Sequence, residues 1–141
     1  MTFHDSPPSI REAEPPKLEA IIELMFLAAF ADGDFGEEER VHFLRSIESL
    51  TDRRMKAETV AMLVNRIIGD LSAQGRAARL ASVKQRLGDA GARKAALALA
   101  IQVTAADGII RTSERELIFE AAEALDIDRD EAADLVSKTG R

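Results

Sequence analysis

The chain has 141 residues, of which 46% are hydrophobic, which suits one domain with a substantial core. It has no cysteine and only two histidines, so disulfides, thiolate metal sites and zinc sites built on several histidines are excluded. A net charge of −6, without tryptophan or tyrosine, argues against nucleic-acid binding, which uses basic surfaces and stacked aromatic rings.

The first 16 residues contain all four prolines, which predicts a disordered tail over residues 1–16. The longest unbroken apolar stretch runs from Leu24 to Ala31, far short of the ~20 residues that a bilayer requires. The N-terminus does not have the pattern of a signal peptide. We therefore expect a cytoplasmic protein without a transmembrane segment, folded as one domain over residues 17–138.

The rest of the chain has the apolar spacing of helices, which predicts an all-α bundle of about seven helices. They are expected at residues 17–32, 37–50, 53–72, 75–87, 90–106, 112–125 and 128–138. The first and fifth are apolar on most of their circumference, so we expect them at the centre, with Leu27 and Leu99 in the core. The last begins with Asp128 and Glu131, the pattern of a capping box.

Part of the sequence repeats after 75 residues: the Ala-Asp-Gly of residues 31–33 recurs at 106–108, and the Glu-Arg of residues 39–40 recurs at 114–115. Each copy follows an apolar helix and precedes an amphipathic one. This predicts a repeated helical hairpin and a pseudo-twofold fold. The two glycines, Gly33 and Gly108, suit the left-handed conformation in which helices commonly end.

The repeated aspartates, Asp32 and Asp107, fall at predicted C-terminal helix ends, where a negative charge costs ~0.3–1 kcal/mol. Hydrogen bonds from backbone N–H groups of the next helix could offset this cost. A cation held together with Glu39 and Glu114 could do so as well, with Asp34 as a further candidate ligand. Such oxygen ligands favour calcium, magnesium or manganese. The residues themselves leave both interpretations open.

Two established metal motifs do not fit this region. An EF-hand loop beginning at Asp32 would need glycine where Glu37 stands and glutamate where Phe43 stands. Glu39 and His42 have the Glu-x-x-His spacing of di-iron bundles, but the second copy has Leu117 in place of the histidine. Since no nucleophile motif or phosphate-binding loop occurs either, we expect no enzyme.

The charges form three blocks along the chain. Residues 1–50 carry 4 basic and 11 acidic side chains, residues 51–94 carry 10 and 4, and residues 95–141 carry 5 and 10. The basic block is normally expected to be a solvated face. It could also dock an acidic protein partner or membrane headgroups. The candidate docking residues are Arg76, Arg79, Arg86 and Arg93, all expected to be exposed.

The buried helix that ends in Ala-Asp-Gly, the glutamate run that follows it, and the second copy at residues 105–115 resemble the TerB-like family. This family includes the tellurite-resistance protein TerB and the N-terminal domain of DjlA-type co-chaperones. The resemblance covers about residues 17–138. It implies an all-helical bundle, a link to tellurite or other chemical stress, and metal binding by acidic motif residues. Here those are Asp32, Glu39, Asp107 and Glu114.

The sequence departs from the family pattern at Arg111, where the second copy would usually have an Asp or Ser cap. It also lacks a J-domain and a membrane helix. We therefore expect a non-enzymatic TerB-like protein that binds a divalent cation and takes part in a stress-response assembly. The alternative is a protein-interaction module, like a co-chaperone regulator domain, in which the acidic motifs are purely structural.

Overall fold

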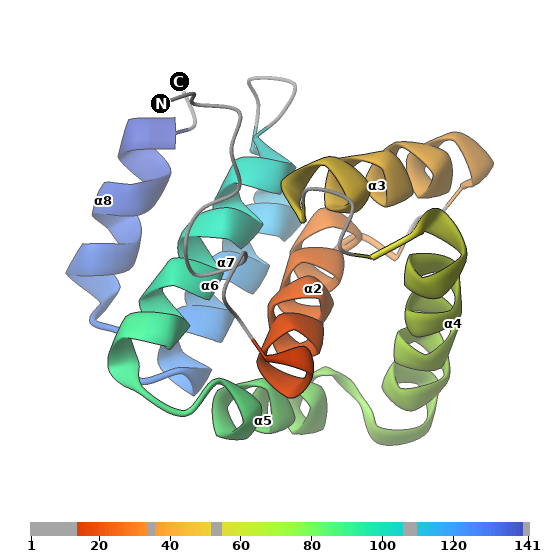
Figure 1. Cartoon of the computed structure of the whole chain (residues 1–141). Helices are drawn as coiled ribbons and strands as arrows, with labels where there is room; N and C mark the ends of the chain where they lie inside the picture. Colours follow the sequence, from red (N-terminus) through yellow and green to blue (C-terminus); the bar gives the residue numbers. More distant parts are fainter. Residues whose placement is uncertain (1–13, 34–35, 52–54, 106–109, 140–141) are drawn as a thin grey trace, which may run out of the picture.

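The computed structural model of the chain (Figure 1) describes residues 14–33, 36–51, 55–105 and 110–139. These residues form seven helices and no strand, which confirms the all-α prediction. The helices are α2 (Pro15–Ala29), α3 (Glu37–Leu50), α4 (Ala57–Gln74), α5 (Arg76–Leu87), α6 (Ala90–Thr104), α7 (Thr112–Ala124) and α8 (Arg129–Thr139).

Both ends of α2 differ from the prediction. The helix begins at Pro15, inside the predicted tail, because the fixed φ and missing N–H of proline suit the first turn of a helix. It ends at Ala29, where a turn over residues 30–33 follows. The Gly33 N–H donates to the Phe30 carbonyl at 3.0 Å, and Gly33 has the predicted left-handed conformation, with φ of 82°.

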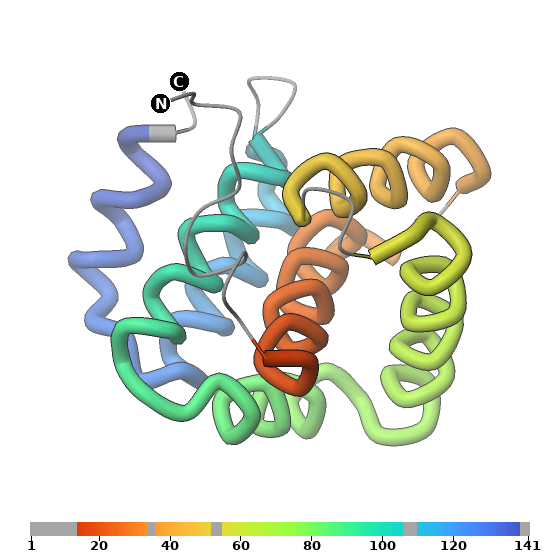
Figure 2. The backbone as a smooth tube through the Cα atoms, in the orientation of Figure 1, coloured from red at the N-terminus to blue at the C-terminus, as the bar shows by residue number. Residues whose placement is uncertain are grey.

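Helix α2 lies at the centre and packs mainly against α6 and α5 (Figures 1 and 2). Leu27 of α2 and Leu99 of α6 are each only 3% exposed, which confirms both as core residues. The α3–α4 hairpin lies on one side of this centre, and α7 and α8 pack against α6. The predicted central pair of helices is therefore the observed one.

The α3 helix is anchored by an aromatic cluster at the C-terminal end of α2. The ring of Phe43 meets the rings of Phe26 and Phe30 edge-on, with centroids 5.8 and 5.6 Å away. Such contacts add ~0.5–1.5 kcal/mol to ordinary burial. They fix the first turns of α3 beside the end of α2.

Ion pairs join the three charge blocks of the sequence. The basic middle of the chain pairs with the acidic N-terminal part through Arg66 and Glu19, whose nearest atoms are 2.6 Å apart. It pairs with the acidic C-terminal part through Arg76–Glu120, Lys84–Asp126 and Lys94–Glu131. The alternation of charge along the sequence thus becomes charge pairing between helices.

Across the described ranges, no helix combines the length and the apolar character needed to cross a bilayer.

Candidate functional site

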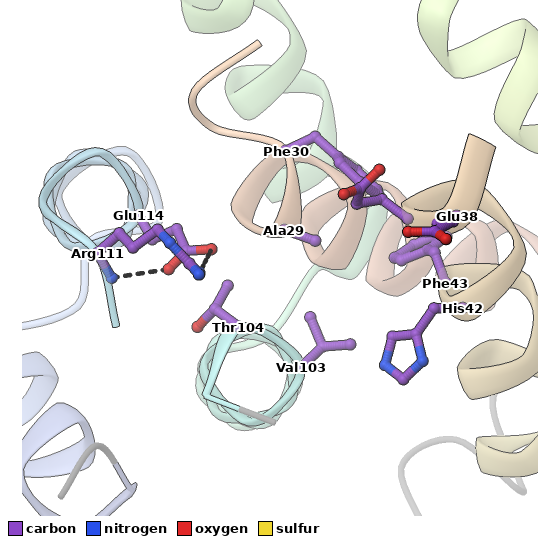
Figure 3. A pocket seen from close by; sticks show the side chains of 10 residues that line it. Ala29, Phe30, Glu38, His42, Phe43, Val103, Thr104, Arg111 and Glu114 are labelled. Atoms are coloured by element: carbon purple, nitrogen blue, oxygen red, sulfur yellow. Dashed lines mark hydrogen bonds and ion pairs between the residues drawn. The ribbon is translucent and has the colours of Figure 1, made fainter. Parts of the chain in front are cut away.

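A pocket of about 360 Å³ opens where α2, α3, α6 and α7 meet (Figure 3). Its size falls within the range of small-ligand sites. The lining residues are Ala29, Phe30, Glu38, Glu39, His42, Phe43, Val103, Thr104, Arg111 and Glu114. The aromatic cluster and α6 supply its apolar wall, and the first turns of α3 and α7 supply its charges.

Two carboxylates from equivalent places in the sequence repeat line this pocket. Glu39 is the third residue of α3, and Glu114 is the third residue of α7. Ala29 and Thr104, which are also 75 residues apart, line the same pocket. The pocket therefore brings together the two halves of the repeat, although the pseudo-twofold relation itself stays a prediction.

Both glutamates fold back toward the residue that precedes their helix. The Arg111 N–H donates to Glu114 Oε1 at 2.8 Å, which is one half of a capping box. Glu39 Oε1 lies so close to Gly36 that a Cβ atom added there would be 2.6 Å away. Position three of each helix thus directs a carboxylate back over the helix start, beside the pocket.

The ionised groups that line the pocket leave it negative overall. Glu38, Glu39 and Glu114 contribute three carboxylates, and Arg111 contributes one positive charge. The nearest guanidinium nitrogen of Arg111 is 4.0 Å from Glu114 Oε2, and the Glu114 side chain is only 10% exposed. Burial strengthens the electrostatic effect of that carboxylate on anything that enters the pocket.

The other predicted metal ligands lie elsewhere or outside the described residues. Asp32 is exposed in the turn after α2 and is not part of the pocket lining. Asp34 and Asp107 fall outside the described residues, and so does Gly108. Within the described part of the chain, no three His, Asp or Glu side chains lie close enough together to hold a metal ion. Of these five predicted or candidate ligands, the structure brings Glu39 and Glu114 to one pocket.

The predicted docking residues Arg76, Arg79, Arg86 and Arg93 were expected to be exposed, and this is wrong at three of the four, including Arg93, whose side chain is 19% exposed. Arg79 and Arg86 of α5 both hydrogen-bond Glu23 of α2. The Glu23 side chain is 1% exposed, and those of Arg79 and Arg86 are 11% and 24% exposed. The seven-residue spacing of the arginines does place them on one face of the helix, but that face turns toward a buried carboxylate.

The electrostatics of this cluster favour the charged form of Glu23. Burial alone would raise the pKa of the Glu23 carboxyl, but the hydrogen bonds and charges of Arg79 and Arg86 hold it below its ordinary value of 4.5. The hydrogen bond to Glu23 in turn raises the pKa of Arg79. The cluster thus fastens α5 to the central helix through fully charged groups.

The remaining two arginines also have partners within the chain. Arg76 pairs with Glu120 of α7 at 2.7 Å, and 41% of its side chain is exposed. Arg93 donates to the backbone carbonyls of Gly88 and Leu125, at 2.8 and 3.0 Å. Their role in docking a partner stays a prediction, and Arg76 is the more accessible of the two.

Sequence reasoning missed Glu23, although one signal was present. It is an acidic residue within an otherwise apolar stretch of α2, and a buried charge needs a partner. The wall residues Val103 and Thr104 were missed as site residues too. Nothing in the sequence distinguishes them from ordinary core positions, because only the meeting of four helices makes a pocket there.

A family model described as "Tellurite resistance protein TerB" matches residues 18–137. No curated protein and no solved structure matches the chain.

Proposed function

Since the chain belongs to the TerB family, whose description links it to tellurite resistance, we propose that it acts without catalysis as a divalent-cation-binding member of a cytoplasmic stress-response assembly. The ion would be held by Glu39 and Glu114 together with Asp32 and Asp107. Calcium, magnesium and manganese are the cations that this all-oxygen set of donors suits.

One observation carries this proposal: Glu39 and Glu114, from equivalent positions of the repeat, line the same pocket. Two carboxylates at one negatively charged pocket are a poor arrangement unless a positive charge offsets their repulsion. Arg111 offsets part of it from one side of the pocket. A cation between the helix starts would offset the rest.

The ligand atoms that the described residues offer are of the type that a hard cation prefers. They are carboxylate oxygens: Glu114 Oε1 accepts from the Arg111 N–H, and Glu114 Oε2 lies 4.0 Å from the Arg111 guanidinium. Because the described residues alone offer no cluster of three ligands, the aspartates of the two motif turns would have to complete the site. A bound ion would supply positive charge that ties the start of α3 to the start of α7.

Thermal unfolding with and without divalent ions tests this proposal. Calcium, magnesium or manganese should stabilise the chain, by ~2.7 kcal/mol when the ion is at 100 times its dissociation constant. The double variant Glu39→Gln, Glu114→Gln should lose this effect, because glutamine keeps the shape and the cap acceptor but lacks the charge. Glu37→Gln with Glu116→Gln, exposed positions of the same helices, is the matched control. A melting temperature that ignores both EDTA and every added ion would refute the proposal.

A protein-interaction module with purely structural acidic motifs is the second candidate. It is favoured by the hydrogen bond from Arg111 N–H to Glu114, which gives that carboxylate a role in capping α7. In that case the glutamine variants should melt close to the wild-type temperature in every buffer.

A further inference from the structure

The pocket beside the starts of α3 and α7 has an apolar wall, which offers no ligand atoms to an inorganic ion. Ala29, Phe30, Phe43 and Val103 give it an apolar and partly aromatic lining. A hydrated divalent ion gains nothing from such a surface, because its ligands are oxygens. An apolar wall stabilises carbon groups that leave water.

The charges lie beside this wall rather than apart from it. Figure 3 shows Glu114 on one side of the pocket and Glu38 on the other, with Val103 and Thr104 on α6 between them. Three carboxylates against one guanidinium leave the lining negative. A ligand that suits both features carries a positive group at the end of a short apolar stem.

We infer that this pocket binds an alkylammonium group, with the stem against Phe30, Phe43 and Val103 and the ammonium at Glu39 and Glu114. An ammonium donates three hydrogen bonds, so it suits a pocket to which α3 and α7 each contribute carboxylates. Aromatic rings beside it add cation–π attraction. The group could belong to a free amine or to a lysine side chain of a partner protein.

This inference concerns the pocket of the proposed function but does not require that a metal bind there. Both ligands would use Glu39 and Glu114, so a divalent ion and an alkylammonium should compete. They differ at the wall, because only the alkylammonium contacts Val103. That difference separates the two hypotheses experimentally.

An NMR titration of the full chain, labelled with nitrogen-15, tests the inference with n-butylammonium as the probe. Butanol and butyrate have comparable stems with neutral and negative ends. We expect saturable shifts at the starts of α3 and α7 with butylammonium, at about millimolar affinity for so small a ligand. Butanol should bind about tenfold more weakly, and butyrate not at all. Equal binding of all three probes, or no binding of butylammonium, would overturn the inference.

Single substitutions identify which residues of the pocket contact the butylammonium. Glu39→Gln and Glu114→Gln should each weaken butylammonium binding about tenfold, because each removes a charge-assisted hydrogen bond. Glu37→Gln and Glu116→Gln should leave it unchanged, and equal effects of all four would contradict the assignment. Val103→Thr keeps the side-chain shape but makes the wall polar. It should weaken butylammonium binding and leave magnesium or calcium binding unchanged.

A second probe, Nα-acetyl-lysine methylamide, keeps the side-chain ammonium and distinguishes a lysine side chain from a free amine as the source of the alkylammonium group. If it binds as tightly as butylammonium and with the same response to the variants, the site can accept a partner's lysine. If butylammonium binds and the lysine derivative does not, the site takes free amines. Metal binding that persists when both amines fail would refute the inference while leaving the proposed function standing.

Discussion

Glu23 of α2 accepts two hydrogen bonds from the guanidinium of Arg79 on α5, at 2.7 and 2.9 Å, across 56 residues of sequence. Arg86, two turns further along α5, donates to the same carboxylate. The carboxylate is 1% exposed, so water supplies little of its solvation. Breaking a buried, hydrogen-bonded ion pair by removing one partner is strongly destabilising, because the other charge stays buried.

Removal of the buried Glu23 carboxylate should therefore lower the free energy of unfolding far more than removal of an exposed carboxylate. We expect Glu23→Ala to lower the free energy of unfolding by about 3–5 kcal/mol. Glu19→Ala, on the same helix, removes the exposed pair with Arg66 and should cost less than about 1 kcal/mol. Urea unfolding of both variants measures the difference. A cost below 1 kcal/mol at Glu23 would show that the cluster does not hold α5 in place.

Acid should weaken the same cluster. Because the folded-state pKa of Glu23 is lowered from 4.5, the unfolded chain takes up its proton first as the pH falls. The stabilisation is complete above about pH 4.5 and is lost as the pH falls through the lowered value. In urea unfolding between pH 7 and pH 3, Glu23→Gln should show a flatter pH dependence than the wild type. The hydrogen bond and charge of Lys84 also lower the pKa of Asp126, but this carboxyl is exposed and screened by water, so Asp126→Asn should change the slope less. Equal slopes in the wild type and both variants would contradict the assignment.

The Glu39 carboxylate lies in space beside Gly36 that a larger residue would fill. The Gly36 backbone is extended, with φ of −76°, so alanine fits the backbone, but the new Cβ would meet Glu39 Oε1 at 2.6 Å. We expect Gly36→Ala to displace the carboxylate and to weaken cation binding, with a stability loss of about 0.5–1 kcal/mol at this cap position. Gly69→Ala on α4 meets no atom within 4 Å and should raise stability by about 0.5–1 kcal/mol, with unchanged cation binding. Calorimetric titration of both variants distinguishes a local effect from a general one.

A further prediction concerns the stability contributed by core residues of the two central helices, α2 and α6. Leu27→Ala and Leu99→Ala should each lower the free energy of unfolding by about 2–5 kcal/mol, because both side chains are buried in the core. Chemical denaturation is the measurement. A loss well under 1 kcal/mol at both positions would place the core elsewhere.

The fold could be predicted from periodicity because each helix has its own apolar pattern, and α2 and α6 are apolar on most sides. The residues at which α2 begins and ends could not be predicted from this periodicity. Pro15 and Pro16 suit both an extended tail and the first turn of a helix, and only packing decides between them. At the other end, the apolar sequence continues through Ala31 although the helix stops at Ala29.

The site was partly predictable for a related reason. The repeat identified Glu39 and Glu114 as equivalent residues, and equivalence was enough to expect them together. The shared partner of Arg79 and Arg86 could not be predicted, because the spacing of two arginines on one helix does not reveal which other helix they contact. The apolar wall of the pocket depends on the meeting of four helices, which no local pattern encodes.

The stoichiometry of divalent-cation binding tests the central claim most directly, because the claim is that two copies of one motif share one site. Calorimetric titration of the full chain with calcium, magnesium and manganese should give one ion per chain for at least one of them. Either Glu39→Gln or Glu114→Gln alone should abolish that binding. Two ions per chain, each lost separately with its own glutamate, would contradict the shared site, and no binding of any ion would contradict the cation itself.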